Sequence, residues 1–178
     1  MKPLRKQLIN WLFEKSMVLY CQFKKKEPWG LSSEDLLCLP THTFGYRLGM
    51  FLSTNGFELI PKVERHDAYH LLCGYGTTVE DEIALQYACF GNGKRTPYLY
   101  GVLILGTILL PDYFTYYLKS YRFGKSANSF HHFDFKKVLP LDFNEFRKAL
   151  FPEKAINEMR SYRRNSMMSR PKFSPYDY

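Results

Sequence analysis

Two histidines and two carboxylates lie on either side of a glycine-rich break, and this arrangement constrains the fold more than any other feature of the chain. His66, Asp67 and His70 precede the break Gly74-Tyr75-Gly76, and Glu82 follows it. A helix turns by about 100° per residue, so the first three side chains share one face if their segment is helical. The pattern therefore predicts a helical segment that presents several polar ligands on one side.

The glycine break predicts a helical hairpin. We expect a first helix over residues 61–74 and a second helix over residues 79–90. Thr77 or Thr78 should cap the start of the second helix. His70 lies six positions before Gly76 and Glu82 lies six after it, so in an antiparallel hairpin the two side chains reach the same height. Glu82 can then close the site that the histidines begin.

Two imidazoles and two carboxylates form a mixed nitrogen and oxygen ligand set. It predicts a divalent metal site at His66, Asp67, His70 and Glu82, with zinc first and iron, manganese or cobalt as alternatives. No cysteine pair competes for this role, which leaves a coordination position for water or substrate. The alternative is that the histidines lie on a helix surface and the acids are solvated.

These residues resemble the ubiquinone (coenzyme Q) biosynthesis family of the "coenzyme Q protein four" type. The hallmark of that family is His-Asp-x-x-His, eleven residues and then Glu, which His66, Asp67, His70 and Glu82 reproduce. Weaker similarity extends over about residues 36–152, in the stretches Leu39–Leu48, Ala84–Gly93, Tyr121–Ala127 and Phe143–Leu150. Two features depart from the family: Asp81 stands where it usually has glycine, and the stretch from Phe51 to His66 is shorter.

The resemblance implies an all-helical protein that binds a divalent metal and works at a membrane surface. It implies a prenylated quinone precursor or another isoprenoid lipid as ligand, with removal of the ring carboxylate and hydroxylation at that carbon as the reaction. Other quinone-biosynthesis enzymes are implied partners. Glu82 or Asp67 is a candidate catalytic proton carrier, should either leave the metal.

Two other functions fit the same residues. A non-catalytic protein could bind an isoprenoid lipid and recruit enzymes, with the metal in a purely structural role. A metal-dependent phosphohydrolase of the His-Asp type would instead use His42, the His66-Asp67 doublet and Asp112. This last alternative makes His70 and Glu82 dispensable.

Length and charge predict one domain with two basic ends. The chain has 178 residues and a net charge of +8. We expect a basic amphipathic helix in residues 1–30, a helical metal-binding core in 31–152 and a flexible basic segment in 153–178. Without a recognisable nucleic-acid module, the basic ends favour an anionic lipid surface. No secretory signal is evident, so we expect a cytoplasmic protein, peripheral on the inner membrane, and self-association remains open.

The spacing of apolar residues predicts an all-α bundle. An apolar stripe marks a first helix that covers the core or lies on a membrane: Leu4, Leu8, Trp11, Leu12 and Leu19. Tyr98 to Leu110 is too short to span a bilayer and predicts a buried helix, in which Gly101 and Gly106 admit a neighbouring helix or an isoprenoid tail. We further expect Gly124 to cap the next helix, and residues 98–117 to line part of an apolar cavity beside the metal.

Overall fold

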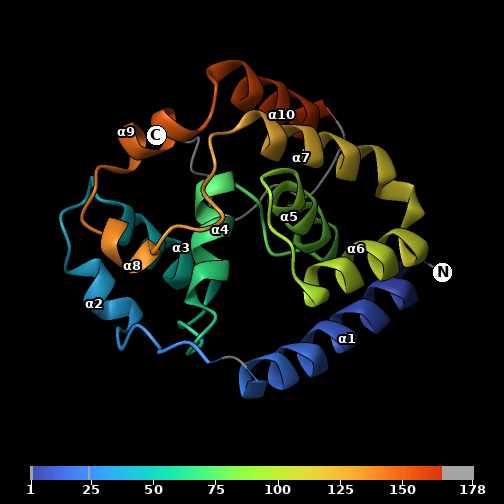
Figure 1. The fold of residues 1–178 in the computed structure, drawn as a ribbon, viewed down its shortest axis with the longest axis horizontal. Coiled ribbons are helices and arrows are strands. Elements are labelled where there is room, and N and C mark those ends of the chain that lie inside the picture. The colour runs from blue at the N-terminus through green and yellow to red at the C-terminus, as the bar shows by residue number, and fades with distance from the viewer. Residues whose placement is uncertain (1, 24, 166–178) are drawn as a thin grey trace.

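The computed structural model describes residues 2–23 and 25–165 (Figure 1). These ranges contain ten α-helices and one 3-10 helix: α1 Lys2–Phe23, α2 Ser33–Leu37, α3 Phe44–Asn55, α4 Glu64–Cys73, α5 Val79–Gly91, α6 Pro97–Leu109, η1 Pro111–Tyr113, α7 Phe114–Ser126, α8 Phe135–Val138, α9 Phe143–Leu150 and α10 Glu153–Asn165. In the same ranges no β-sheet forms, and an isolated bridge joins Thr43 to Asp142. The all-α prediction is confirmed.

Local capping signals explain where most helices begin and end. A side-chain oxygen accepts a hydrogen bond from the first turn of five helices, at Ser32, Thr43, Thr78, Thr96 and Asp142. Gly56 and Gly74 end α3 and α4 in the left-handed conformation, with φ of 69° and 70°. The hairpin that carries the predicted ligands is therefore fixed by its own sequence.

Helix α5 lies at the centre of the molecule, between α4, α6 and α7 (Figure 1). Its closest partner is α7, and glycine makes this approach possible. A Cβ atom on Gly124 would lie 1.9 Å from the carbonyl oxygen of Ala88 on α5. The prediction that Gly124 caps α7 is wrong: the helix continues to Ser126, and this glycine admits the backbone of α5.

Helix α6 is buried on one side only, contrary to the prediction of a buried helix. Leu99, Val102 and Leu103 face the core, whereas Ile104 and Ile108 are 60% and 68% exposed. Gly106 packs against Ile83 of α5, whereas a Cβ atom on Gly101 would meet no atom within 4 Å, so Gly101 faces open space. One side of helix α6 is thus buried and the other is exposed, although nearly all of its residues are apolar.

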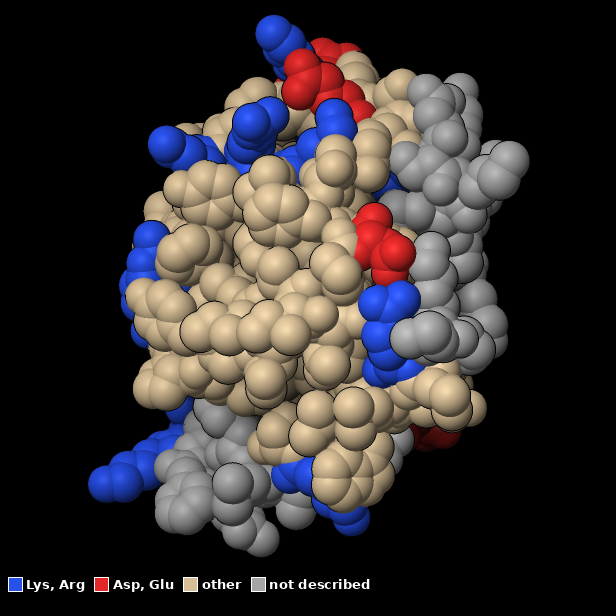
Figure 2. All heavy atoms as spheres, turned by 90° about the vertical axis from the view of Figure 1, so that its right-hand side faces the viewer, with Lys and Arg blue, Asp and Glu red and all other residues tan. Residues whose placement is uncertain are grey.

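The exposed side of α6 belongs to a wider apolar face. This face comprises exposed side chains from α1, α6 and α7: Leu4, Leu8, Trp11, Tyr100, Ile104, Leu105, Ile108, Phe114 and Leu118. Figure 2 views the side of the molecule that carries α6, where uncharged residues cover the centre, and Lys and Arg together with some Asp and Glu lie around it. The side chain of Leu19 lies outside the described part of the chain.

Within the described residues, no single helix is long and apolar enough to cross a membrane. One bent pair, Pro97–Leu109 with Pro111–Ser126, satisfies the length and composition criteria across an angle of 102°.

The segment after residue 152 is more ordered than its composition suggests. Helix α10, Glu153–Asn165, occupies the first part of the segment predicted to be flexible, where one or two helical turns over residues 152–160 were also expected, and it extends to Asn165. Ile156 and Met159 are buried, and α10 packs along α7. The remainder of the predicted flexible segment, residues 166–178, lies outside the described residues.

Candidate metal centre

The α4–α5 hairpin brings His66, His70 and Glu82 together. His66 and His70 lie one turn apart on α4, and Glu82 lies in the first turn of α5. Glu82 Oε1 lies 3.1 Å from His70 Nε2, and Glu82 Oε2 lies 3.3 Å from His66 Nε2. One ligand atom from each residue falls within 4.8 Å of the others, so the three could hold one metal ion.

The buried imidazole of His70 is held from several sides. Its ring stacks on Phe51 with centroids 5.9 Å apart, and it meets the ring of His66 edge-on at 4.7 Å. Its Nδ1 lies 3.4 Å from the carbonyl oxygen of Tyr75. When Nδ1 carries the hydrogen it donates to this carbonyl, which leaves the Nε2 lone pair directed at Glu82 and available to a metal.

Asp67 does not join this group of three. It borders the same cavity and interacts electrostatically with His70 and Glu82, but its oxygens are not among the clustered ligand atoms. The structure thus assembles two histidines and one carboxylate, and places the second carboxylate on the neighbouring wall. Catalytic zinc sites commonly use such a set of three protein ligands and keep a position open.

Charge coupling inside the cluster sets its protonation. Burial acts to lower the pKa of His70, but Glu82 outweighs this effect, with help from Asp67 and the Tyr75 carbonyl, and raises the pKa to about 9. The two histidines hold the pKa of Glu82 well below its usual range although burial opposes them. At His66 the effect of burial is larger than the effect of the Glu82 charge, so the pKa of this ring is lowered. Without metal, a proton on His70 therefore compensates Glu82.

The environment of Asp67 raises the pKa of its carboxyl group, whereas the environment of Glu82 lowers the pKa of its own. Burial, together with the nearby charges of Glu82 and Glu64, raises the pKa of Asp67 to about 7, although His70 acts to lower it. A carboxyl group with a pKa near neutrality can both hold and release a proton under ordinary conditions. This property suits a proton carrier better than a permanent metal ligand.

The cluster opens into a cavity of about 1070 Å³. Apolar side chains form much of its wall: Phe13, Phe51, Phe57, Ile60, Val63 and Tyr98. Polar and charged residues make up the rest of the lining, so the cavity offers both apolar and polar surface. Such a cavity suits a ligand with two chemically different parts.

The segment predicted to line part of the cavity contributes little to it. Of residues 98–117, only Tyr98 lines it, because α6 directs its other apolar side chains into the core or outward. Lys94, Arg95 and His131 line the cavity although they were not predicted to do so. They come from two loops, and no local pattern marks them, since tertiary packing alone brings these loops to α4.

Other residues considered from the sequence lie elsewhere. His42 and Asp112, which a His-Asp phosphohydrolase would require, neither join the metal cluster nor line the cavity. Asp112 instead pairs with Arg5 at 3.1 Å. Cys73 is buried and is also absent from the cluster. The arrangement therefore gives no support to the phosphohydrolase alternative.

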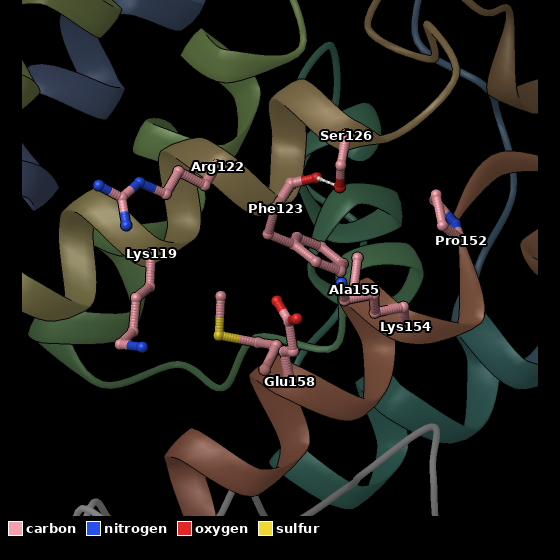
Figure 3. Close-up of a pocket in the computed structure, with 9 residues that line it drawn as sticks. Lys119, Arg122, Phe123, Ser126, Pro152, Lys154, Ala155 and Glu158 are labelled. Carbon is pink, nitrogen blue, oxygen red and sulfur yellow. Dashed lines mark hydrogen bonds between the residues drawn. The ribbon is translucent and has the colours of Figure 1, made fainter.

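A smaller cavity of about 350 Å³ lies between α7 and α10 (Figure 3). Lys119 and Arg122 come from α7, and Lys154 and Glu158 come from α10. It shares no lining residue with the large cavity and contains none of the clustered ligands. Its lining contains the carboxylate of Glu158 as well as exposed cations.

Comparison with known proteins identifies a similar fold. The chain matches no protein-family model and no curated protein sequence. It does resemble the crystal structure of a protein from Nostoc punctiforme PCC 73102 that is provisionally named a ubiquinone biosynthesis protein. The TM-score is 0.59 at 22% sequence identity, over 83% of this chain and 81% of the other. At this level of identity, the similarity establishes the fold.

Proposed function

We propose that the protein binds a divalent metal ion through His66, His70 and Glu82 and holds a prenylated aromatic acid, a quinone precursor, in the adjoining cavity. The observation that carries this proposal is the junction between the ligand cluster and the large, partly apolar cavity. The ligand would place its ring near the cluster and its isoprenoid tail against the apolar wall. The name of the protein with a similar fold is consistent with this ligand class.

A role in catalysis is favoured by the openness of the cluster. The structure assembles three ligand residues, and His66 and Glu82 remain partly exposed toward the cavity. A purely structural site usually closes with four protein ligands, whereas a catalytic site keeps room for water or substrate. Zinc fits the donor set, and iron, manganese and cobalt are alternatives. The bound ion would act as a Lewis acid.

The proposed reaction is removal of the ring carboxylate. The bond between the ring and the carboxyl carbon breaks, carbon dioxide leaves, and the electron pair left on the ring takes up a proton. Asp67 borders the cavity beside the cluster, and its pKa of about 7 allows its carboxyl group to supply that proton. Replacement of the carboxylate by hydroxyl would additionally require an oxidant such as dioxygen.

The apolar face formed by α1, α6 and α7 supports a place at a membrane surface. A prenylated precursor resides in lipid, and a protein that takes it up benefits from contact with the bilayer. Clustered exposed apolar side chains of this extent commonly mark an interaction site. We propose that this face rests on the membrane and that the protein is peripheral on its inner side.

Metal analysis with matched variants tests the proposal. We expect purified protein to carry one divalent ion per chain, and His66→Ala and Glu82→Gln to lose most of it. His132→Ala removes an exposed histidine outside the cluster and should retain the metal. Circular dichroism confirms that each variant is folded. Equal metal content in all four proteins would contradict the assignment.

A further inference from the structure

We propose that four cationic residues on the wall of the large cavity, Lys26, Arg65, Lys94 and Arg95, bind the acidic group of its ligand independently of the metal. We call these residues the cationic rim. The inference rests on the proposed function, because it concerns the ligand of the same cavity. It assigns positioning and specificity to residues outside the metal cluster.

The cationic rim is assembled from three separate parts of the chain. Lys26 follows α1, Arg65 lies in the first turn of α4, and Lys94 and Arg95 lie in the α5–α6 loop. Gly93 turns this loop with φ of 105°, and a Cβ atom there would lie 3.0 Å from the ring of His131. The loop therefore needs glycine immediately before its two cations.

The two loop cations are held in place by the surrounding residues. Lys94 Nζ lies 5.1 Å from the ring centroid of Tyr69, and the guanidinium of Arg95 lies 4.1 Å from that of Phe90. Arg95 Nη1 also donates to the carbonyl oxygens of Phe90 and Lys94 at 2.7 and 2.8 Å. These contacts restrain the side chains without neutralising their charge.

The positive charge of the rim is not compensated locally. Among the described residues, none of the four cations forms an ion pair with a carboxylate. Burial, with the charges of Arg65 and Lys94, lowers the pKa of Lys26, and Asp134 opposes this. Lys26 therefore lies close enough to Arg65 and Lys94 for their charges to repel. An acidic ligand would relieve that repulsion.

The carboxylates that line the cavity are engaged elsewhere. Glu58 accepts hydrogen bonds from Ser33, and Glu82 lies between the two clustered histidines. The third carboxylate, Asp67, lies beside the metal cluster. The cavity thus combines an apolar wall, a metal cluster with its own carboxylate, and an unpaired cationic rim. These features match an amphiphile whose carboxylate binds the rim.

Binding measurements on metal-free protein separate the rim from the metal. The probes are a prenylated hydroxybenzoate and its methyl ester, which differ in the charge of one group. We expect wild-type protein treated with chelator to bind the acid roughly tenfold more tightly than the ester, as charge-assisted hydrogen bonds would give. Lys94→Gln with Arg95→Gln removes two of the four rim cations and should clearly reduce this preference while leaving ester affinity unchanged.

A double variant in the smaller cavity provides a matched control. Lys119→Gln with Arg122→Gln removes the same charge from α7, away from the rim (Figure 3). It should retain the preference for the acid. Equal affinity of wild-type protein for acid and ester overturns the inference while the proposed ligand class stands. A preference that is undiminished in the rim variant also overturns it, and failure of both probes to bind wild-type protein overturns both proposals.

Discussion

At the scale of single residues, the site depends on a competition between a proton and a metal ion. His70 carries the proton that compensates Glu82 when no metal is bound, because the carboxylate raises the pKa of His70 to about 9. A divalent ion bound at the same Nε2 must displace this proton. Glu82 therefore faces a positive charge both with and without metal, which lets the protein keep this carboxylate at the edge of its core.

Asp67 lacks such a compensating partner, and its substitution gives a pH-dependent prediction. Its pKa of about 7 in the folded protein exceeds its ordinary value of 3.8, so folding is increasingly penalised as pH rises between these values. An asparagine side chain cannot ionise and escapes the penalty. We therefore expect Asp67→Asn to stabilise metal-free protein relative to wild type, and to do so more at pH 8 than at pH 5.

Chemical denaturation of chelator-treated protein at the two pH values measures this difference. Asp134→Asn removes an exposed carboxylate and controls for the general loss of negative charge. A stability gain for Asp67→Asn that is larger at pH 5 than at pH 8 would show that the folded environment favours the ionised carboxylate, and Asp67 would then be a poor proton donor.

At the scale of helices, the packing of α5 on α7 holds the site in place. Helix α5 carries Glu82 at its start and ends at the loop of the cationic rim, so its position governs both. Gly124 on α7 lies against the backbone of Ala88, and Gly91 on α5 lies against that of Tyr121. Two glycines thus allow the helix backbones to approach more closely than side chains would permit.

Alanine at Gly124 should disrupt this packing. Its Cβ atom would lie 1.9 Å from a backbone oxygen, so the two helices must move apart. We expect Gly124→Ala to lower the free energy of unfolding by about 3 kcal/mol or more. Gly101→Ala adds the same atom in open space on α6 and should raise that free energy by about 0.5–1 kcal/mol. Thermal or chemical denaturation compares them, and equal stability of the two variants would contradict the close approach.

Features of the fold that depend on residues close together in the sequence could be predicted. The hairpin was predictable because Gly74 and Thr78 determine its turn locally, and ligand spacing then follows from helix geometry. The role of Gly124 was not, because a glycine that ends a helix and one that admits another helix look alike in sequence. The full length of helix α10 was underestimated because its buried side chains Ile156 and Met159 lie among many charged residues. The cationic rim depends on contacts between distant loops.

At the scale of the whole molecule, the large apolar face and the cavity suggest a common function. Ile104 and Ile108 are 60% and 68% exposed, and Leu4 and Trp11 on α1 are 69% and 53% exposed. Arg5 and Lys6 join α1 to the rest of the molecule through Asp112 and Glu80. The same helix contributes Phe13 to the wall of the large cavity. Helix α1 therefore belongs both to the proposed membrane face and to the chamber proposed to hold the ligand.

Vesicle binding tests the proposed membrane face. Each exposed isoleucine buried in the acyl boundary would contribute roughly 1–2 kcal/mol, so Ile104→Ser with Ile108→Ser should weaken binding by about tenfold or more. Leu141→Ser removes an apolar side chain that is 45% exposed and lies outside α1, α6 and α7, and it should have little effect. Because Lys and Arg lie around the face (Figure 2), binding should also strengthen with anionic lipid and weaken with salt. Sedimentation with vesicles measures these effects. If the double variant binds as tightly as wild type while remaining folded, contact with the bilayer is made elsewhere, and the apolar face would instead be a surface for another protein chain.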